Sequence, residues 1–204
     1  MNSTVRGPDG ELRCSWCSAA PEFLEYHDRE WGYPVDDDIR LFEKLCLESF
    51  QSGLSWRTIL TKREKFRAAF SNFDFNLVAK YNDSDVGRLM KNEGIVRHRG
   101  KIEAVINNAK KAKALVKQEG SLASYFWQFE PDENNLSRPQ TASSSTDSIA
   151  LSKALKKQGW KFVGPTTIYA FMQAMGLVND HADDCVYRKK IEQTRKQFKR
   201  PERA

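Results

Sequence analysis

A segment that is apolar on two sides constrains the fold of this chain more than any other. Ile39, Phe42 and Cys46 recur at helical spacing, and Leu41 and Leu45 form a second stripe beside them. A helix with apolar residues on both sides is buried among other elements. Sustained alternation of apolar and polar residues, the pattern of half-buried strands, does not occur in the sequence. The predicted fold class is therefore all-α.

The same helix carries an acidic residue among its apolar neighbours and ends at a tight turn. Glu48 lies on the second stripe, where a carboxylate is costly unless it has a partner. By periodicity alone, the favoured interpretation is a side chain that reaches solvent at the helix end. Gly53 suits the left-handed position after a helix, and Ser55 suits the N-cap of a helix predicted over 55–70. This corner places Glu48 near Trp56, a large aromatic side chain.

Composition restricts the class of protein. The 204 residues are 40% hydrophobic and 29% charged, which is typical of a soluble globular protein of one large domain or two small lobes. No apolar run approaches the ~18–20 residues that span a bilayer, and the first residues lack the apolar core of a signal peptide. We therefore expect a cytoplasmic protein without a membrane partner. The net charge of +6 favours a polyanion such as nucleic acid, although a mildly basic enzyme fits equally well.

The sequence divides into a main domain and two tails. Residues 1–12 are polar and predict a disordered N-terminal lead, whereas residues 191–204 form a basic C-terminal tail. The helical patterns lie in the domain between them, over 13–190. Within this domain, residues 131–147 are rich in Pro, Ser, Thr and Asn without periodicity, and they predict a long surface loop.

Two helices joined by a short glycine-containing turn follow the loop, at about residues 149–176. The turn ends in Lys-Phe-Val-Gly at 161–164, and Pro165 suits the first position of the second helix. Such a helix-hairpin-helix can hold a nucleic-acid phosphate. Gly164 lets the backbone approach the anion, and the N–H groups at the helix start point towards it. An ordinary helical hairpin has the same pattern and is the alternative.

A second basic segment, residues 97–101, precedes a helix that runs to about Lys117. Its arginine and lysine side chains could grip phosphates, or they could form a solvated charged turn. The pattern does not separate these interpretations, and we expect His98 to belong to the turn.

Cysteine and histidine residues near the two ends of the sequence could form a metal site. His181 and Cys185 are four residues apart and share a helical face, and Cys14 and His27 supply a second couple. Two cysteines and two histidines suit a closed tetrahedral zinc site. The wide separation of the couples instead favours buried thiols and solvent-exposed histidines. Cys14 and Cys17 also make a Cys-x-x-Cys motif, but the strand–helix pattern of a redox motif is missing around it.

Several stretches, taken in order along the sequence, resemble one family. They are Arg-Cys-Ser-Trp at 13–16, Tyr-His-Asp-Arg-Glu-Trp-Gly at 26–32, Leu-Glu through Gly-Leu-Ser-Trp at 47–56, Arg-His-Arg-Gly-Lys at 97–101, Lys-Phe-Val-Gly at 161–164 and Gly-Leu-Val-Asn-Asp-His at 176–181. The family is 3-methyladenine DNA glycosylase I, within the helix-hairpin-helix DNA glycosylase superfamily. The resemblance covers about residues 12–187. It implies an all-α helix-hairpin-helix fold in which a zinc site joins the N- and C-terminal segments, and it makes 13–190 a glycosylase domain.

The resemblance also implies the ligands of that zinc. One structural ion would be held by Cys14, His27, His181 and Cys185, with no part for Cys17. Asp180 precedes one of these ligands, and we expect it to orient that ligand or to cap a helix.

Further residues acquire roles from the same resemblance. Glu48 would contact the damaged base and is the catalytic candidate, and Tyr26 and Trp56 would form the stacking pocket. Phe23 joins this substrate-binding set at a position where family members commonly carry tyrosine. A cationic base would offset the burial of Glu48 through charge-assisted hydrogen bonds. The implied DNA-binding residues are Gly53 and Leu54, which would fill the gap in the duplex, and Lys161, Val163 and Gly164 of the hairpin.

The activity implied is flipping and excision of 3-methyladenine from double-stranded DNA that contains alkylated bases, by hydrolysis of the N-glycosidic bond. Bifunctional members of the superfamily carry a lysine nucleophile two residues after the hairpin glycine, where this chain has Thr166, so the enzyme would be monofunctional, without lyase activity. We expect a monomer that acts at the nucleoid in the cytoplasm. The alternatives are a non-catalytic, zinc-stabilised protein that binds damaged DNA and a nucleobase-binding protein that acts away from DNA.

Overall fold

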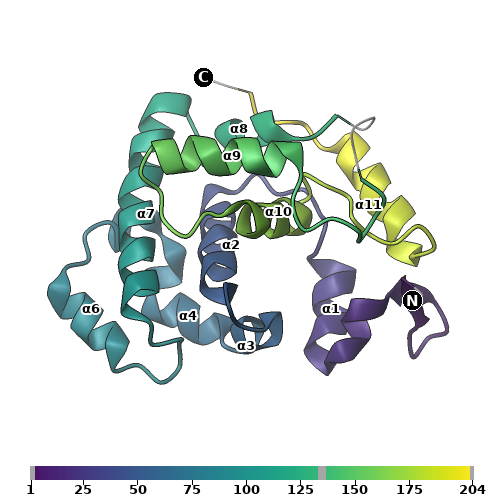
Figure 1. Ribbon diagram of the computed structural model, residues 1–204, viewed down its shortest axis with the longest axis horizontal. Helices are drawn as coiled ribbons and strands as arrows, with labels where there is room; N and C mark the ends of the chain where they lie inside the picture. Colours follow the sequence, from purple (N-terminus) through teal and green to yellow (C-terminus); the bar gives the residue numbers. More distant parts are fainter. Residues whose placement is uncertain (1–2, 133–136, 203–204) are drawn as a thin grey trace.

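The structure is a helical assembly arranged around one central helix. A computed structural model describes residues 3–132 and 137–202. Helix α2 runs through the middle, with α4 and α7 on one side and α1 and α11 on the other (Figure 1). The elements are β1 (Thr4–Arg6), β2 (Leu12–Cys14), η1 (Ser15–Ala19), α1 (Pro21–Arg29), α2 (Asp38–Gln51), α3 (Trp56–Leu60), α4 (Arg63–Ala69), η2 (Ser71–Phe73), α5 (Phe75–Val78), α6 (Asp83–Met90), α7 (Arg99–Glu119), α8 (Leu122–Phe126), η3 (Trp127–Phe129), α9 (Thr146–Lys157), α10 (Pro165–Ala174) and α11 (Val186–Gln197).

Helix α2 is buried because apolar side chains occupy both of its stripes. Leu41, Phe42 and Leu45 are fully buried. The Asp37 side chain caps the helix by accepting a hydrogen bond from the backbone N–H of Arg40 at 2.8 Å. Helices α7, α8 and α10 all pack against α2. The prediction of a buried helix from its two stripes is confirmed.

The first described segment is a β-hairpin, so the predicted disordered lead over 1–12 is wrong for residues 3–12. Strands β1 and β2 pair antiparallel. The Arg13 guanidinium donates to Asp28 at 3.0 Å and to Asp9 at 2.6 Å, which ties the hairpin to α1. Strands of three residues are too short for an alternating pattern to stand out. The fold is therefore mostly helical with one small sheet.

Two other predicted boundaries differ from the structure. The helix expected over 55–70 is two helices, because the chain leaves helical geometry at Lys62, between α3 and α4. The tail expected over 191–204 is part of α11 as far as Gln197. Ile191 is fully buried on that helix, so its apolar contact extends the folded domain past residue 190.

Helices α9 and α10 form the expected hairpin and pack against each other (Figure 1). Helix α9 begins inside the predicted loop over 131–147, because Ser145 caps it by accepting from the backbone N–H of Ser148. Residues 133–136 of that loop lie outside the described residues. Gly159 has a φ of +85° directly after α9, which is the conformation that favours glycine.

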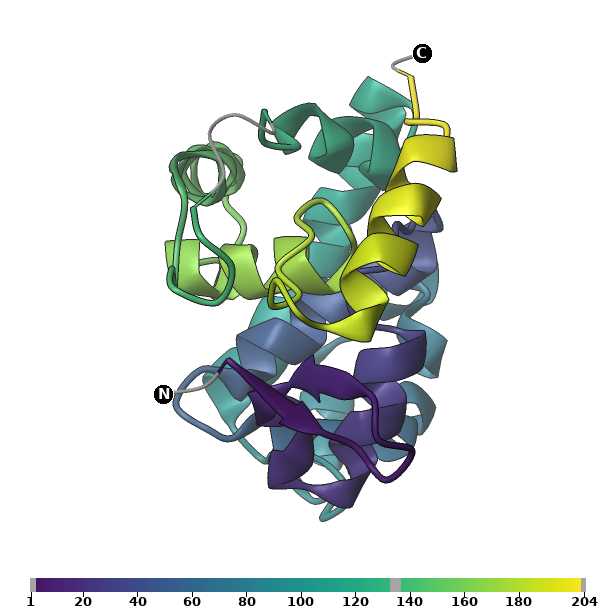
Figure 2. The ribbon, with the colours of Figure 1, turned by 90° about the vertical axis from the view of Figure 1, so that its right-hand side faces the viewer.

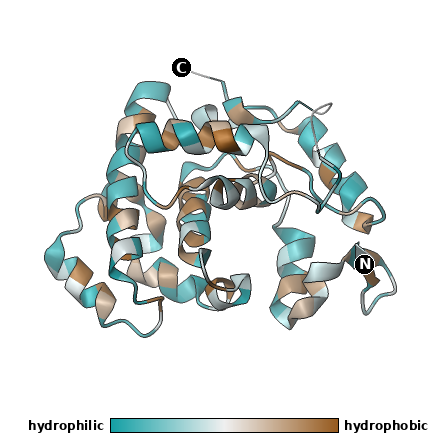
Figure 3. Ribbon diagram, in the orientation of Figure 1, coloured by the Kyte–Doolittle hydropathy of each residue, from teal (hydrophilic) through white to brown (hydrophobic). Residues whose placement is uncertain are grey.

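Segments from the two ends of the chain lie side by side. The N-terminal hairpin and α11 occupy the same side of the molecule in Figures 1 and 2, and α11 contacts β2. Hydrophobic and hydrophilic residues alternate along α9 (Figure 3), and Leu151 and Leu155 of this helix are fully buried. Among the described residues, no helix combines the length and apolar character needed to cross a membrane.

Candidate functional site

A cavity of about 290 Å³ opens beside the C-terminal half of α2. Its volume lies near the lower end of ordinary small-molecule pockets, roughly 300 Å³. Helices α1, α2, α3 and α10 contribute walls, together with η1 and the segments around residues 140 and 180. The lining side chains are Trp16, Tyr26, Trp31, Glu48, Gln51, Trp56, Gln140, Ala142, Ala170, Gln173 and Asp180.

Glu48 lines this cavity and is buried, so the solvent-reaching side chain favoured by periodicity is wrong. Its exposed fraction is only 5%. Lys44, one turn earlier on α2, places its Nζ 2.7 Å from Glu48 Oε1. The same ammonium donates to Tyr26 Oη at 2.6 Å and lies 3.5 Å from the centroid of the Trp56 ring. The partner that a buried carboxylate requires is therefore supplied by the chain itself.

Burial and ion pairing shift the pKa values of the polar groups beside Glu48. Burial lowers the pKa of Lys44, whereas the charge of Glu48 and its hydrogen bond raise that pKa. Burial raises the pKa of Tyr26 well above its ordinary value, and Glu48 adds to the effect. Tyr26 therefore remains a neutral phenol at this site.

Aromatic rings form much of the cavity wall. The centroids of Tyr26 and Trp56 lie 5.3 Å apart with the planes tilted by 47°. Two tryptophans without an assigned role in the sequence analysis, Trp16 and Trp31, also line the cavity, with their centroids 5.0 Å apart. Phe23, which the sequence placed in the substrate-binding set, is not among the lining residues. Its ring packs edge-on against Trp16, with the two ring centroids 5.9 Å apart.

Asp180 also faces the cavity, in a role different from the one expected. Its carboxylate accepts from the backbone N–H of Gln140 at 2.9 Å and from the Gln173 side chain at 2.6 Å. These bonds join the segment before α9 to α10, and no helix of the described residues is capped by Asp180. Burial raises the pKa of Asp180, against the lowering effect of the two hydrogen bonds. Position after the hairpin in the sequence was the only available signal for this residue.

A second hollow of about 270 Å³ continues from the cavity towards the hairpin. Glu48 and Gln51 line both, and the corner residues Gly53 and Leu54 meet the start of α10 across the second one. Gly53 has a φ of +78°, as expected after a helix, and Leu54 is 42% exposed. The corner therefore presents an apolar side chain beside an opening that leads to Glu48.

The three hairpin residues assigned to DNA binding differ in their environment. Lys161 is exposed, and its backbone N–H and carbonyl both pair with the Asn108 side chain on α7. The Val163 side chain is fully buried, so only its backbone could reach a ligand. A side chain at Gly164 would meet nothing within 4 Å, which leaves open space directly before α10.

Ser55 caps α3 as expected, through the N–H of Thr58.

The basic segment at 97–101 divides between structural and exposed positions. Lys101 is buried and donates to the carbonyls of Phe50 and Ser52, at 2.8 and 2.5 Å, so it supports the corner after α2. His98 caps α7 by accepting from the N–H of Lys101. The segment is therefore neither a simple phosphate clamp nor a simple solvated turn.

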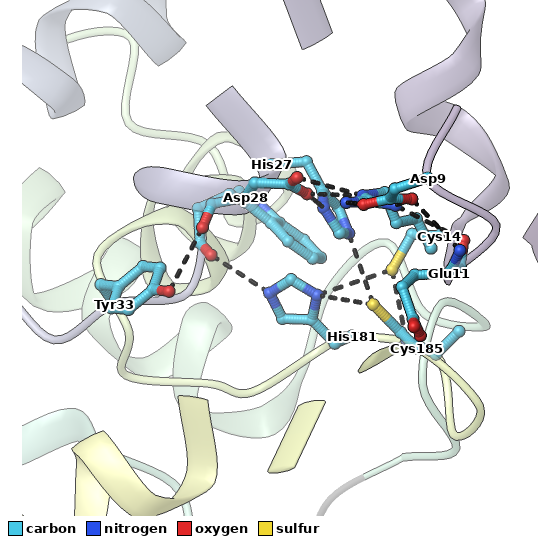
Figure 4. A network of polar contacts seen from close by, with 11 residues as sticks. Asp9, Glu11, Cys14, His27, Asp28, Tyr33, His181 and Cys185 are labelled. Carbon is cyan, nitrogen blue, oxygen red and sulfur yellow. Dashed lines mark hydrogen bonds and ion pairs between the residues drawn. The ribbon is translucent and has the colours of Figure 1, made fainter. Parts of the chain in front are cut away.

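Cys14, His27, His181 and Cys185 converge between the two ends of the chain, with all four ligand atoms within 4.8 Å of one another (Figure 4). Cys185 Sγ lies 3.6 Å from His27 Nε2 and 3.4 Å from His181 Nδ1, and Cys14 Sγ lies 3.7 Å from His181 Nδ1. A tetrahedron with Zn–S bonds of about 2.3 Å and Zn–N bonds of about 2.0 Å has edges of roughly 3.3–3.8 Å. These three separations match the edges of such a tetrahedron. Both histidines are fully buried, so the alternative of solvent-exposed histidines is wrong.

The surroundings of the cluster also fit a metal. His27 Nδ1 pairs with Asp28 at 2.7 Å (Figure 4). His181 Nε2 lies 3.1 Å from the backbone carbonyl of Trp31. Ligating histidines commonly direct the other ring nitrogen to a carboxylate or a carbonyl in this way. The pKa of Cys185 is lowered, first by the hydrogen bond from Cys14 and then by the two histidines, which favours a thiolate ligand.

Comparisons with known proteins agree with this arrangement. The family model described as methyladenine glycosylase matches residues 16–189. Over 177 residues the chain is 48% identical to DNA-3-methyladenine glycosylase 1 of Escherichia coli and 46% identical to DNA-3-methyladenine glycosylase of Haemophilus influenzae. These matches cover 85% of this chain and 95% and 96% of the two relatives. A solved structure of 3-methyladenine DNA glycosylase I in complex with 3-methyladenine superposes with a TM-score of 0.80 at 35% identity, over 86% of this chain and 97% of that one. The chain therefore belongs to the methyladenine glycosylase family.

Proposed function

We propose that the chain is a monofunctional DNA glycosylase that flips and excises 3-methyladenine from alkylated double-stranded DNA. The observation that carries the proposal is Glu48, a buried carboxylate in an aromatic-walled cavity that continues to the hairpin side of the molecule. The relatives named above and the complex with 3-methyladenine support the choice of base.

The residues of the cavity suit a flipped, alkylated base. Tyr26, Trp16 and Trp56 offer ring faces on which a base stacks, a contact worth about 1–3 kcal/mol per base. Lys44 pairs with Glu48 Oε1, which leaves Oε2 to accept from an exocyclic N–H group of the base. Trp56 Nε1 is a buried donor with no partner among the described residues, so it can also bind an entering ligand.

Excision of this base requires little help with the leaving group. Alkylation at N3 gives the base a positive charge in DNA, and the electrons of the glycosidic bond neutralise that charge as the bond breaks. Water then adds to the sugar carbon and releases a proton. The protein's contributions are to extrude the base, to hold it against Glu48 and to exclude bases of other shape. Leu54, exposed at the mouth of the second hollow, is positioned to fill the gap left in the duplex.

The hairpin would bind the DNA backbone without an accompanying lyase step. Thr166 lies two residues after Gly164 and lines the second hollow, and its hydroxyl cannot form a Schiff base with the sugar. Open space at Gly164 and the first N–H groups of α10 suit a phosphate.

We also propose that Cys14, His27, His181 and Cys185 hold one structural zinc ion, because both the donor set and the separations suit that metal. The ion would fasten the N-terminal hairpin and α1 to the segment before α11. Trp16 and Asp180 each lie within two residues of a ligand, so the site would also hold two walls of the base cavity in place.

The test is release of free base from methylated double-stranded DNA, followed by chromatography of the supernatant. We expect free 3-methyladenine, with strand breaks appearing only after alkali treatment because the enzyme leaves an abasic site. Glu48→Gln should release base at least tenfold more slowly than the parent. Binding of methylated DNA without any release would instead support the non-catalytic alternative, a zinc-stabilised protein that binds damaged DNA.

A further inference from the structure

Lys44 does not line the cavity itself, but it places a positive charge next to Glu48, where recognition of a cationic base does not require one. Its side chain is 7% exposed on the inner face of α2. The ammonium already contacts three groups that a cation could use, namely one oxygen of Glu48, the Tyr26 hydroxyl and one face of Trp56. A cationic base that enters the cavity therefore meets a carboxylate that is already paired.

Lys44 forms its ion pair with Glu48 and not with Asp180, the other carboxylate of the cavity, which accepts hydrogen bonds from two glutamine residues. On the side of Lys44 away from the cavity, Glu30 pairs with Arg63 at 2.6 Å and Glu43 pairs with Arg67 at 2.7 Å. Each of these carboxylates is matched by its own arginine. Glu48 is left as the carboxylate that Lys44 neutralises.

We propose that Lys44 is the resident counter-ion of Glu48 and neutralises that carboxylate, so that cationic and neutral bases of the same shape bind against Glu48 with similar affinity. Lys44 acts through Glu48 as a positioning residue that determines charge specificity. This inference rests on the proposed function and deepens it. Selection of the alkylated base then depends on shape, stacking and the weak glycosidic bond of that base, and not on its charge.

The pairing of Glu48 with Lys44 has a consequence for the reaction. The base enters as a cation and, once the bond electrons return to its ring, leaves as a neutral molecule. With Lys44 in place, Glu48 is paired before, during and after this change. Without Lys44, the neutral product would leave a buried carboxylate uncompensated, which is costly.

The experiment compares two ligands of similar shape and different charge. The probes are 3-methyladenine, neutral in mildly alkaline buffer, and 3,9-dimethyladeninium, a fixed cation that mimics the base as it is attached to sugar. Affinities are measured by calorimetric titration for the parent, Lys44→Met and the double variant Lys44→Met/Glu48→Gln. Methionine conserves most of the side-chain volume. Lys44→Gln serves as a second single variant, because its amide can still donate to Tyr26 and Glu48.

For the parent we expect the two ligands to bind within about threefold of each other, a difference below about 1 kcal/mol. In Lys44→Met the preference for the cation over the neutral base should rise at least tenfold, about 1.4 kcal/mol. It should return towards the parent value in the double variant, where both charges are gone. If Lys44 were purely structural, its replacement would weaken the binding of both ligands equally. An unchanged preference for the cation in both single variants overturns the inference. If the parent binds neither ligand and releases no base from DNA, the proposed function itself has failed.

Discussion

Replacing Glu48 with glutamine should destabilise the protein by leaving a buried ammonium without its anion. The side chains of Lys44 and Glu48 are 7% and 5% exposed, so water replaces little of the lost attraction. Removing one partner of a buried pair costs about 3–5 kcal/mol. The glutamine carbonyl and Tyr26 Oη can still accept from Lys44, which reduces the expected loss to about 2–3 kcal/mol, the upper range for a hydrogen bond to a charged group. For a chain of this length that corresponds to a fall in Tm of about 4–12 °C.

The loss of stability in Glu48→Gln should depend on pH in a defined direction. Burial holds the pKa of Lys44 below its ordinary value, and Glu48 opposes that shift. Without Glu48 the folded-state pKa of Lys44 falls further, whereas its unfolded-state pKa does not change. Between these pKa values the unfolded chain binds more protons than the folded one, so the stability of the variant rises with pH. The free energy of unfolding of Glu48→Gln should fall furthest below that of the parent while Lys44 is charged. The difference should shrink once the pH exceeds the lowered pKa of Lys44.

Urea unfolding followed by tryptophan fluorescence, at neutral and at alkaline pH, measures this deficit directly. The double variant Lys44→Met/Glu48→Gln is the matched control, and it should recover part of the lost stability and lose the added pH dependence. The reasoning is refuted if Glu48→Gln is as stable as the parent at neutral pH, or if its deficit grows as the pH rises.

Three further predictions concern other parts of the site. The parent should contain one zinc ion per chain by elemental analysis, and Cys185→Ala should contain none and melt at a lower temperature; a metal-free parent contradicts the proposed site. Trp56→Ala should bind free 3-methyladenine roughly 5- to 150-fold more weakly, since base stacking is worth about 1–3 kcal/mol; titration that finds equal affinity removes Trp56 from the stacking surface. Leu54→Ala should bind free 3-methyladenine like the parent but excise it from duplex DNA more slowly, and an equal loss with the free base would place Leu54 in the cavity and not at the duplex.

Some features of the site could be read from local patterns because the forces that produce them act over a few residues. The two apolar stripes of α2 predicted its burial, and Gly53 and Ser55 predicted the corner after it, since helix ends depend on a few neighbouring backbone groups. The short strands β1 and β2 escaped prediction because pairing, and not alternation, stabilises them. The interruption between α3 and α4 likewise carries no strong breaker in the sequence.

Side chains that meet across the fold could not be placed in this way. Phe23 shares a helical face with Tyr26, yet its ring packs edge-on against Trp16 and does not line the cavity. Asp180 enters the cavity through bonds to Gln140 and Gln173, which only the packing of the loop on α10 brings together.

The sequence by itself determined that the chain is mostly helical, that a carboxylate lies in an apolar helix and that two Cys/His couples exist near its ends, because these are properties of spacing and residue type. Only the tertiary structure decided that the couples meet in one buried cluster and that the partner of Glu48 is Lys44. The physical reason is that burial makes an unpaired charge costly, and which partner relieves that cost depends on the neighbours that folding brings within hydrogen-bond distance.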